Sequence, residues 1–359
     1  MVFGAGRLLC SAMYGNPLHV IKPSLVLKMY YLINFQSKKC FMKHFLFISY
    51  TFIAVAILMI PLALWLGGPG TPAPIANIND PFESVDFSSM PPLKNYQGAD
   101  GAKLFYREYS PQGNHKGSAV LVHGSSGSSD SMHPMATALA VAGLHVYAID
   151  IRGHGASGTK GHIGYIGQLE SDMQAFVDTV KPASPSTLIG FSSGGGFVLR
   201  LAASEMQSSF DSYLLLAPFL GHTAPNYIPD SGGWVSVGVP RIVALLALNK
   251  LGIHYWNHLP VTRFALSEEA KKYLTPDYDF NLNTNFAASQ DYQQDLLNAK
   301  GKVAILAGDA DDLLKSQELQ GIVQTAGKDW PVQLLPGIGH IPLTLDPVAL
   351  KAVVELVTH

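Results

Sequence analysis

The segment that most constrains the fold is a β-branched and aliphatic run, residues 187–191, which ends at the pattern Gly-x-Ser-x-Gly with Ser192 at its centre. Small residues around Ser192 are typical of a strand that turns at once into a helix, because such a turn is tight and strained. Gly190 and Gly194 remove the side chains that would collide there. A Gly/Ser loop is the alternative, since the chain contains 34 glycines. The helix-like stretch 195–203 favours the sharp turn.

Strand-like and helix-like segments alternate from about residue 93 to the C-terminus. This alternation predicts an α/β fold with a mostly parallel central sheet and helices on both faces. The strands are aliphatic throughout, as is typical of parallel strands that are buried on both sides. Strands are expected at residues 103–109, 118–123, 144–149, 187–191, 213–217, 303–307 and 332–335, and helices at 132–142, 165–180, 192–206, 313–325 and 347–357.

Residues 218–299 interrupt the alternation. They begin with a Gly/Pro-rich stretch, include the apolar segment 239–251, and contain many Tyr, Trp, Asn and Pro residues. Their position between two core strands predicts an insertion that folds over the edge of the sheet. A lid over a site is the functional interpretation, because long irregular segments of compact domains are often functional, and an inert insertion is the alternative.

An uncharged apolar run of 22 residues, 45–66, precedes the domain. As a helix it would span a hydrocarbon core of ~30 Å. Three lysines precede the run and Asp80 is the first acidic residue after it, so the positive-inside rule places the N-terminus in the cytoplasm. We therefore expect a single-pass transmembrane anchor with the large domain in the periplasm or outside the cell. A cleaved signal peptide, which would give a secreted protein, is the alternative, but its apolar region would be only ~7–15 residues.

Three further segments complete the expected organisation. Residues 1–44 are basic and show no clear periodicity, and either an over-long gene model or a short cytoplasmic tail explains residues 1–41. Residues 67–92 are rich in Pro, Gly, Asn and Ser and are expected to form an exposed linker. Residues 93–359 are then a single α/β domain that carries the 218–299 insertion.

Charge and cysteine content exclude several functions for the domain. Residues 1–79 contain six Lys/Arg and no acidic residue, whereas the remainder has 18 basic and 26 acidic residues. An acidic domain gives no electrostatic reason to bind nucleic acid. The two cysteines, Cys10 and Cys40, both precede the domain, so it has no disulfide, cysteine-based metal site or thiol nucleophile.

Three features supply the parts that a serine nucleophile needs, namely a base in hydrogen-bond reach and a carboxylate that orients the base. Ser192 lies at the predicted turn. Asp309, Asp311 and Asp312 follow a strand, and His340 lies in a Gly-rich loop after the last strand. The order Ser, Asp, His is the one that this architecture requires, and all three features belong to the carboxyl edge of the sheet. The alternatives are an aspartate that caps a helix beginning near residue 313, and a histidine in a surface loop.

A tetrahedral intermediate also needs hydrogen-bond donors for its oxyanion. The strand before residue 123 ends in small residues, so the backbone N–H of Ser125 is the expected first donor. The backbone N–H of Ser193, directly after the nucleophile, is the expected second donor. His123 precedes the nucleophile in the chain and is expected to brace this loop rather than to act as the base.

Together, the pairs His123-Gly124 and Gly339-His340 and the runs 150–157 (Asp-Ile-Arg-Gly-His-Gly-Ala-Ser), 190–194 and 308–311 resemble the α/β-hydrolase superfamily. The chain is most similar to its monoacylglycerol lipase and lysophospholipase-like branch, which is also grouped with serine aminopeptidase-like hydrolases. The resemblance extends from about residue 93 to the C-terminus.

The resemblance implies that Ser192 is the nucleophile, His340 the base and Asp311 the acid, with residues 218–299 as the cap. It implies that Asp150, Arg152 and His154 shape a loop and take no part in the chemistry. Two departures matter. Ser125-Ser126 replaces the usual pair of a small residue and glycine, and the additional carboxylates Asp309 and Asp312 leave the choice of the acid open.

These features predict a membrane-anchored serine hydrolase that cleaves carboxylic esters through an acyl-enzyme on Ser192, with no cofactor and no metal. A lipid-like ester of the lysophospholipid or monoacylglycerol type is favoured, because the cap is apolar and aromatic and the anchor places the domain beside a bilayer. The cap residues that suggest this are Trp234, Tyr255, Trp256 and Phe264.

Two other functions remain open at this point. An aminopeptidase-type serine peptidase would need an acidic pocket for the amino terminus of its substrate, and the candidate carboxylates are Glu268, Glu269, Asp277 and Asp279. A non-catalytic binding protein with the same fold would usually lack a member of the triad. A dehalogenase or epoxide hydrolase with an aspartate nucleophile is disfavoured, because the turn carries serine.

Overall fold

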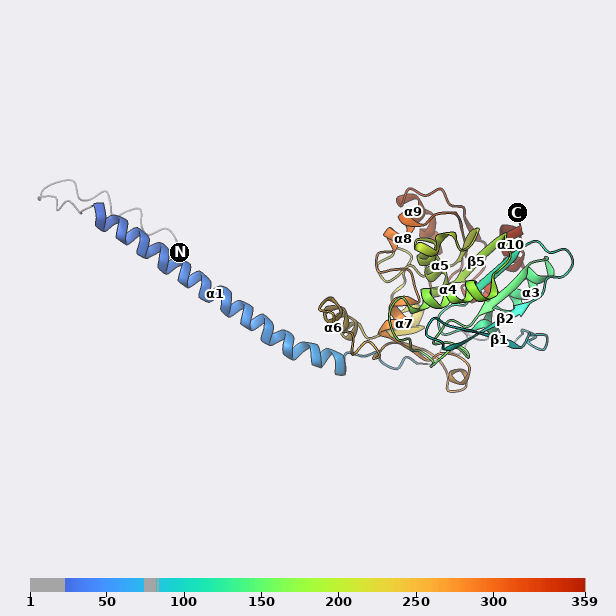
Figure 1. Ribbon diagram of the computed structural model, residues 1–359, viewed down its shortest axis with the longest axis horizontal. Coiled ribbons are helices and arrows are strands. Elements are labelled where there is room, and N and C mark those ends of the chain that lie inside the picture. The colour runs from blue at the N-terminus through green and yellow to red at the C-terminus, as the bar shows by residue number, and fades with distance from the viewer. Residues whose placement is uncertain (1–22, 74–81, 83, 359) are drawn as a thin grey trace, which may run out of the picture. The chain divides into compact units, whose positions relative to one another are not determined.

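The computed structural model describes residues 23–73, 82 and 84–358, and the chain divides into two compact units, residues 1–61 and 62–359. Over its described residues, the first unit consists of most of helix α1 (Pro23–Leu66), drawn in blue in Figure 1. The start of the predicted basic segment, residues 1–22, lies outside the described residues.

Residues 45–66 are helical, as expected, because they belong to α1. Within the ranges that the structure describes, however, no helix is long and apolar enough to cross a membrane. The predicted transmembrane anchor rested on the uncharged run and its flanking charges in the sequence, and the helices of the structure do not support it.

The second unit is built on an eight-stranded sheet with the order β1-β2-β4-β3-β5-β6-β10-β11. The β1–β2 and β2–β4 pairs are antiparallel, and the other pairs are parallel. This confirms the predicted mostly parallel α/β sheet. The strands are β1 (Leu93–Gln97), β2 (Lys103–Tyr109), β3 (Ser118–Val122), β4 (His145–Ile149), β5 (Ser186–Phe191), β6 (Ser212–Leu216), β10 (Lys302–Gly308) and β11 (Val332–Leu335).

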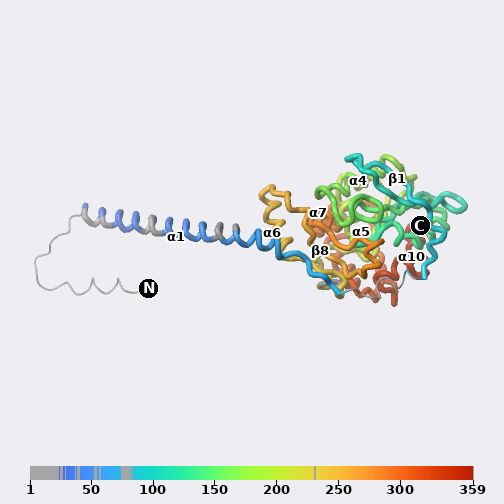
Figure 2. Tube along the Cα trace, turned by 90° about the horizontal axis from the view of Figure 1, so that it is seen from below, coloured from blue at the N-terminus to red at the C-terminus, as the bar shows by residue number. Residues whose placement is uncertain are grey.

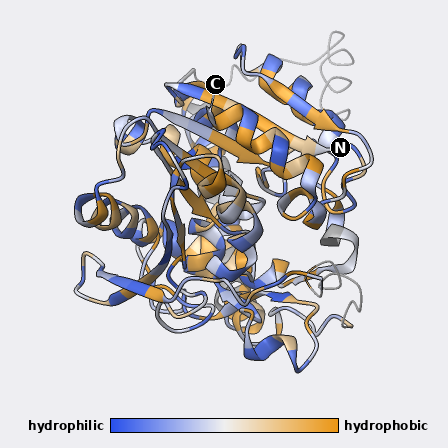
Figure 3. Cartoon of the chain, turned by 90° about the vertical axis from the view of Figure 1, so that its right-hand side faces the viewer, coloured by the Kyte–Doolittle hydropathy of each residue, from blue (hydrophilic) through white to orange (hydrophobic). Residues whose placement is uncertain are grey.

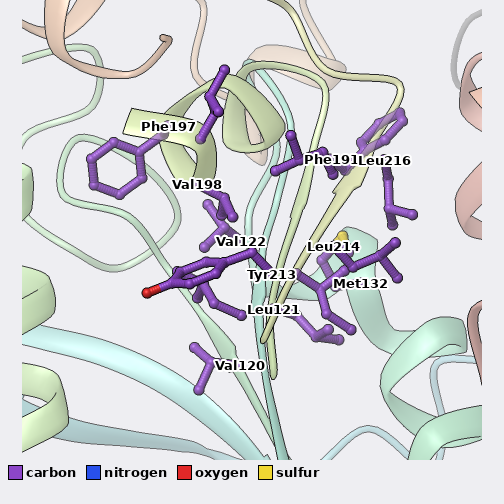
Figure 4. Packing of buried hydrophobic residues seen from close by; sticks show 14 of the residues in the cluster. Val120, Leu121, Val122, Met132, Phe191, Phe197, Val198, Tyr213, Leu214 and Leu216 are labelled. Atoms are coloured by element: carbon purple, nitrogen blue, oxygen red, sulfur yellow. The ribbon is translucent and has the colours of Figure 1, made fainter. Parts of the chain in front are cut away.

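The central strands are buried along their whole length, as their aliphatic sequences require. Every residue of β3 and β5 is buried, and Figure 3 shows hydrophobic colouring on strands in the interior and on parts of the helices. Side chains from β3, β5, β6 and the helix that directly follows β5 (Ser193–Ala202) belong to one cluster (Figure 4). Parallel pairing in which Val122 lies opposite Gly190 brings the ends of β3 and β5 to one edge of the sheet, where β10 also ends. The loops after these three strands therefore meet.

The helices agree with the predicted alternation, with shifted boundaries. Helix α3 packs against α10 and α5 packs against α8, while α4 contacts β1. Figures 1 and 2 both show α6 at one end of the domain and α10 at the other. The helices of this unit are α3 (His133–Val141), α4 (Gln168–Val180), α5 (Ser193–Ala202), α6 (Val239–Lys250), α7 (Phe280–Asn285), α8 (Tyr292–Asn298), α9 (Leu319–Thr325) and α10 (Pro347–Thr358).

The helix expected from residue 313 begins later, at Leu319. The Oδ1 atom of Asp311 accepts hydrogen bonds from the backbone N–H groups of Leu313 and Leu314 at 2.9 and 2.8 Å. These bonds fold the chain into a turn, which a short 3-10 segment (Ser316–Glu318) connects to α9. The helix starts late because the Asp311 carboxylate holds the N–H groups of residues 313 and 314 in this turn.

Part of the 218–299 insertion forms a separate substructure. Its strands β7 (Val235–Val237), β8 (Pro260–Phe264) and β9 (Asp277–Asp279) form a separate antiparallel sheet in the order β7-β8-β9. Helices α6 and α7 adjoin this sheet, whereas α8 packs on α5. The part that contains β7–β9, α6 and α7 is called the cap here.

The chain around residue 67, where α1 ends and the predicted linker begins, is bonded to the cap. The guanidinium of Arg241, on α6, donates to the carbonyl oxygens of Leu64 and Pro260 at 2.8 and 2.6 Å. The guanidinium of Arg263 donates to the hydroxyl of Thr71 at 3.1 Å. The cap is therefore bonded to the chain on both sides of residue 67.

Stability should depend on pH through Asp279, the N-cap residue of α7, which accepts from the N–H of Leu282 at 2.7 Å and lies 2.5 Å from Nδ1 of His162. Burial raises the pKa of Asp279 from 3.8 to about 6. Between these values the native carboxyl keeps a proton that the unfolded chain has lost, so stability falls as pH rises through the window. Asparagine at position 279 can keep the N-cap hydrogen bond of α7. The Tm of Asp279→Asn should therefore exceed that of wild type from pH 4 to 7, by about 2–4 °C for each kcal/mol gained in the free energy of unfolding.

The control is Asp291→Asn, at the N-cap of α8, where the side chain caps a helix in the same way but is exposed. Thermal scans of both variants at several pH values should show the change for Asp279→Asn only. Parallel Tm curves for wild type and Asp279→Asn would show that burial of this carboxyl does not affect folding.

Candidate active site

Ser192 lies between β5 and α5 in a conformation that non-glycine residues rarely adopt, with φ 55° and ψ −117°. The neighbouring glycines leave room for it. A β-carbon at Gly190 would lie 2.2 Å from the carbonyl oxygen of Gly194, and one at Gly194 would lie 2.3 Å from that of His123. The turn therefore has the tight strand-to-helix form that the glycines predict, and it presents the Ser192 hydroxyl at the carboxyl edge of the sheet.

The structure brings Ser192, Asp311 and His340 together in one hydrogen-bonded chain. Nε2 of His340 lies 3.0 Å from Oγ of Ser192, and Nδ1 of His340 lies 2.7 Å from Oδ2 of Asp311. The side chains of His340 and Asp311 are only 3% and 0% exposed. This arrangement can move a proton from the serine hydroxyl to the imidazole while the carboxylate fixes the ring.

Of the three candidate carboxylates, only Asp311 contacts His340. Oδ1 of Asp309 accepts from the N–H of Gly337 at 2.7 Å, and Asp312 is exposed. Burial acts to raise the pKa of Asp311, but the hydrogen bond with His340 and the backbone N–H groups of residues 313 and 314 outweigh it and lower that pKa below 3.8. The carboxylate is therefore ionised at neutral pH.

The two residues that carry the expected oxyanion donors are in contact with each other. The side-chain hydroxyls of Ser125 and Ser193 are hydrogen-bonded to each other. Neither backbone N–H donates to another described residue, and that of Ser193 lies in the first turn of α5, where such groups have no partner within the helix. Gly124 is required here, because its β-carbon would meet the ring of Phe191 at 2.9 Å.

His123 braces this loop, as the sequence predicts. Its Nε2 accepts from the N–H of Ile151 at 3.2 Å, so Nδ1 is the donor to the carbonyl oxygen of Gly124, at 2.8 Å. Burial lowers the pKa of His123, so the ring is neutral and keeps this tautomer.

The run 150–157 shapes the neighbouring loop. The carboxylate of Asp150 accepts from the backbone N–H groups of Ser129 and Ala156 at 2.8 and 2.9 Å. The guanidinium of Arg152 donates to Asp172 at 2.6 Å. These contacts are structural, and none of them reaches Ser192.

A cavity of about 100 Å³ adjoins the triad and is covered by the cap. Of the aromatic residues that suggest a lipid substrate, Trp234 and Phe264 line it, whereas Tyr255 and Trp256 are exposed and do not. No Asp, Glu, Lys or Arg is found among the described residues that line it. They are Gly124, Ser125, Phe191, Ser192, Ser193, Phe219, His222, Trp234, Val235, Val237, Thr262, Phe264, Tyr278, Asn283, Phe286, Leu313, Leu314, His340 and Ile341.

One contact at this site was missed by sequence reasoning. The hydroxyl of Tyr278, on cap strand β9, accepts from the N–H of Ser126 at 2.7 Å and lies 2.6 Å from Nε2 of His154. The partners are 152 and 124 positions apart in the chain, and no motif marks the tyrosine. Only the folded cap brings it to the loop.

The sheet order, the strained turn at Ser192 and the loops that meet there define an α/β hydrolase. The family model for serine aminopeptidase, S33, matches residues 113–346, and the chain belongs to this family.

Sequence relatives include the monoacylglycerol lipase of Mycolicibacterium smegmatis, 33% identical over 157 residues that make up 43% of this chain and 54% of the relative. Human monoglyceride lipase is 30% identical over 142 residues, which are 38% of this chain and 46% of the relative. The chain thus spans about half the length of the curated relatives it matches.

Solved structures support the same fold. The monoacylglycerol lipase of Paleococcus ferrophilus superimposes with a TM-score of 0.54 and 18% identity, covering 71% of this chain and 98% of that one. A soluble variant of the monoglyceride lipase from Saccharomyces cerevisiae, in complex with a substrate analogue, gives a TM-score of 0.56 and 18% identity, covering 75% and 94%. At this level of identity the likeness supports the fold alone.

Proposed function

We propose that the protein hydrolyses carboxylic esters through an acyl-enzyme on Ser192. The observation that carries the proposal is the hydrogen-bonded chain from Ser192 through His340 to Asp311, with distances of 3.0 and 2.7 Å. A serine hydroxyl becomes a useful nucleophile only when a base and an orienting carboxylate are in reach.

In the first half-reaction, Oγ of Ser192 attacks the ester carbonyl and its proton passes to Nε2 of His340. The N–H groups of Ser125 and Ser193 would hold the oxyanion of the tetrahedral intermediate. His340 then protonates the departing alcohol, which leaves the acyl group on Ser192. In the second half-reaction, water gives its proton to His340 and releases the acid by the reverse steps.

We propose a neutral lipid-like ester of the monoacylglycerol type as the substrate. The relatives that carry this activity in their names support it, and so does the apolar lining of the cavity. A lysophospholipid head group would be buried against a described lining without Lys or Arg to pair its phosphate, and an aminopeptidase substrate against one without Asp or Glu. Both are therefore less favourable.

The size of the cavity adds a condition. A volume of about 100 Å³ is smaller than typical ligand pockets of roughly 300–1,000 Å³. It holds the ester group and a few methylenes, so a long acyl chain requires the cap to move. We propose that the cap opens to admit the substrate.

A substrate panel tests this function. Monoacylglycerols of increasing acyl length, lysophospholipids of the same acyl length, and aminoacyl amides should be compared by kcat/KM. We expect the monoacylglycerols to be hydrolysed fastest. Preferential cleavage of the amides would show that the protein is a peptidase. Preferential cleavage of lysophospholipids would overturn the argument from the uncharged lining of the cavity.

The cellular location and a membrane anchor through residues 45–66 are separate proposals. They rest on the charges in the sequence, with lysines before this run and acidic residues after it. We propose that the catalytic domain lies outside the cytoplasm and takes its substrate from the adjacent bilayer. Protease added to spheroplasts, whose cytoplasmic membrane is intact, should digest the domain. Protection until that membrane is broken would contradict this topology.

A further inference from the structure

The loop that carries Ser125 is held by the cap. Ser126 is buried and has a positive φ of 67°, a conformation that favours glycine. Its N–H donates to the hydroxyl of Tyr278 at 2.7 Å, its side chain donates to the carbonyl oxygen of Thr275 at 2.7 Å, and its carbonyl oxygen accepts from the N–H of Thr275 at 2.9 Å. These bonds stabilise an unfavourable backbone conformation directly beside an expected oxyanion donor.

Tyr278 connects this loop to a second buried group. Its hydroxyl accepts from the N–H of Ser126 and lies 2.6 Å from Nε2 of His154. Burial lowers the pKa of His154 well below 6.5, so its ring is neutral. Either the hydroxyl of Tyr278 donates to Nε2 of His154, or Nε2–H of His154 donates to the hydroxyl oxygen. In both cases the tyrosine oxygen also accepts from the N–H of Ser126.

The contacts continue to the second donor. The hydroxyl of Ser125, the residue before Ser126, is hydrogen-bonded to the hydroxyl of Ser193. Tyr278 also orients the peptide group between residues 125 and 126, because it binds the N–H of that group. Tyr278 therefore holds the loop that carries Ser125, and the side chain of Ser125 is bonded in turn to that of Ser193.

We propose that Tyr278 is a positioning residue that sets the separation and direction of the oxyanion donors Ser125 and Ser193. The inference rests on the proposed ester hydrolysis. Because Tyr278 belongs to cap strand β9, closing the cap and completing the oxyanion site are one event. If the cap can close over a bound substrate, the oxyanion donors are in position. If the substrate holds the cap open, they are not, so the contact between Tyr278 and Ser126 also affects which substrates are cleaved.

The test is Tyr278→Phe, which removes one oxygen and keeps the ring that lines the cavity. Loss of one oxyanion donor lowers kcat by about 10²–10³-fold, and a displaced donor pair should lose about 10- to 100-fold. We expect this loss in kcat with little change in KM, because the donors act on the transition state. The affinity for an acyl trifluoromethyl ketone, whose adduct with a serine carries the oxyanion, should fall by a similar factor.

Tyr109→Phe is the matched control. Its hydroxyl is also buried and hydrogen-bonded to a histidine, with Nδ1 of His133 at 3.0 Å, but the residue does not line the cavity. We expect kcat and the affinity for the ketone to stay at the wild-type level in this variant. An equal loss in both variants would show that Tyr278 acts on stability alone, and would overturn the proposal.

A second pair of variants keeps the test decisive if Tyr278→Phe does not fold. Ser125→Ala and Ser193→Ala each break the contact between the two hydroxyls and leave the backbone N–H groups in place. If the contact positions the donors, each variant loses kcat and the double variant loses no more than the worse single one. Wild-type kcat in both, or in a folded Tyr278→Phe, would refute the inference, whereas an inactive wild type would refute the proposed function instead.

Discussion

Ser192→Ala is expected to lower ester turnover by about 10⁴- to 10⁶-fold while the protein stays folded. The loss follows from the 3.0 Å contact between Oγ of Ser192 and Nε2 of His340, because alanine leaves the base without a nucleophile to activate. The fold should persist, since the change removes one oxygen and alanine keeps the same β-carbon at φ 55°. Steady-state rates and labelling by a fluorophosphonate, read by mass spectrometry, measure the effect.

Ser118→Ala is the matched control. Ser118 is a buried serine at the start of β3, and its hydroxyl donates to the carbonyl oxygen of Ala183 at 2.6 Å, at the opposite edge of the sheet from the triad. Turnover and labelling should stay at the wild-type level in this variant. Labelling that persists in Ser192→Ala would move the nucleophile to another residue. A folded wild-type protein that is neither labelled nor active would favour the non-catalytic binding protein.

The sheet was predictable where burial dictates composition. Strands β3, β5 and β6 are aliphatic because helices cover both faces, and their ends were expected to within a residue or so. Strand β1 was missed because it lies at the edge of the sheet, where only one of its five residues is buried and polar side chains are tolerated. The cap strands β7 and β9 have three residues each, which is too short for any periodicity to show.

The site divides along a similar line. Chain order and strand ends bring Ser192 and His340 together, because the loops after parallel strands must meet at one edge. Spacing could not choose among Asp309, Asp311 and Asp312, since adjacent side chains at a strand end point in different directions. Tyr278 was out of reach, because its position depends on how the cap folds over the loop at Ser126. Turns and strand ends can be predicted from neighbouring residues, whereas contacts between an insertion and the rest of the domain cannot.

Asp311→Asn is expected to lower kcat by about 10⁴-fold, far more than the same change at either neighbouring aspartate. The carboxylate accepts from Nδ1–H of His340 at 2.7 Å, which leaves Nε2 free to accept the proton of Ser192. An asparagine can present its NH₂ to Nδ1 instead, and the ring then carries its hydrogen on Nε2 and cannot act as the base. The carboxylate also stabilises the imidazolium that forms during attack, and the neutral amide does not.

Substitution of the neighbouring aspartates tests whether this role belongs to Asp311 or to any carboxylate at the end of β10. Asp312 is exposed, so Asp312→Asn should leave kcat unchanged, and Asp309→Asn should have a small effect because Asp309 only holds the N–H of Gly337. The pKa of Asp311 lies below 3.8, so the carboxylate stays ionised above about pH 5 and a fall in rate with acid must come from another group. That acid limb should therefore persist in Asp309→Asn and Asp312→Asn. If Asp312→Asn proves the worst of the three, the acid lies one residue further along the chain, and the contact between Asp311 and His340 only fixes the turn before α9.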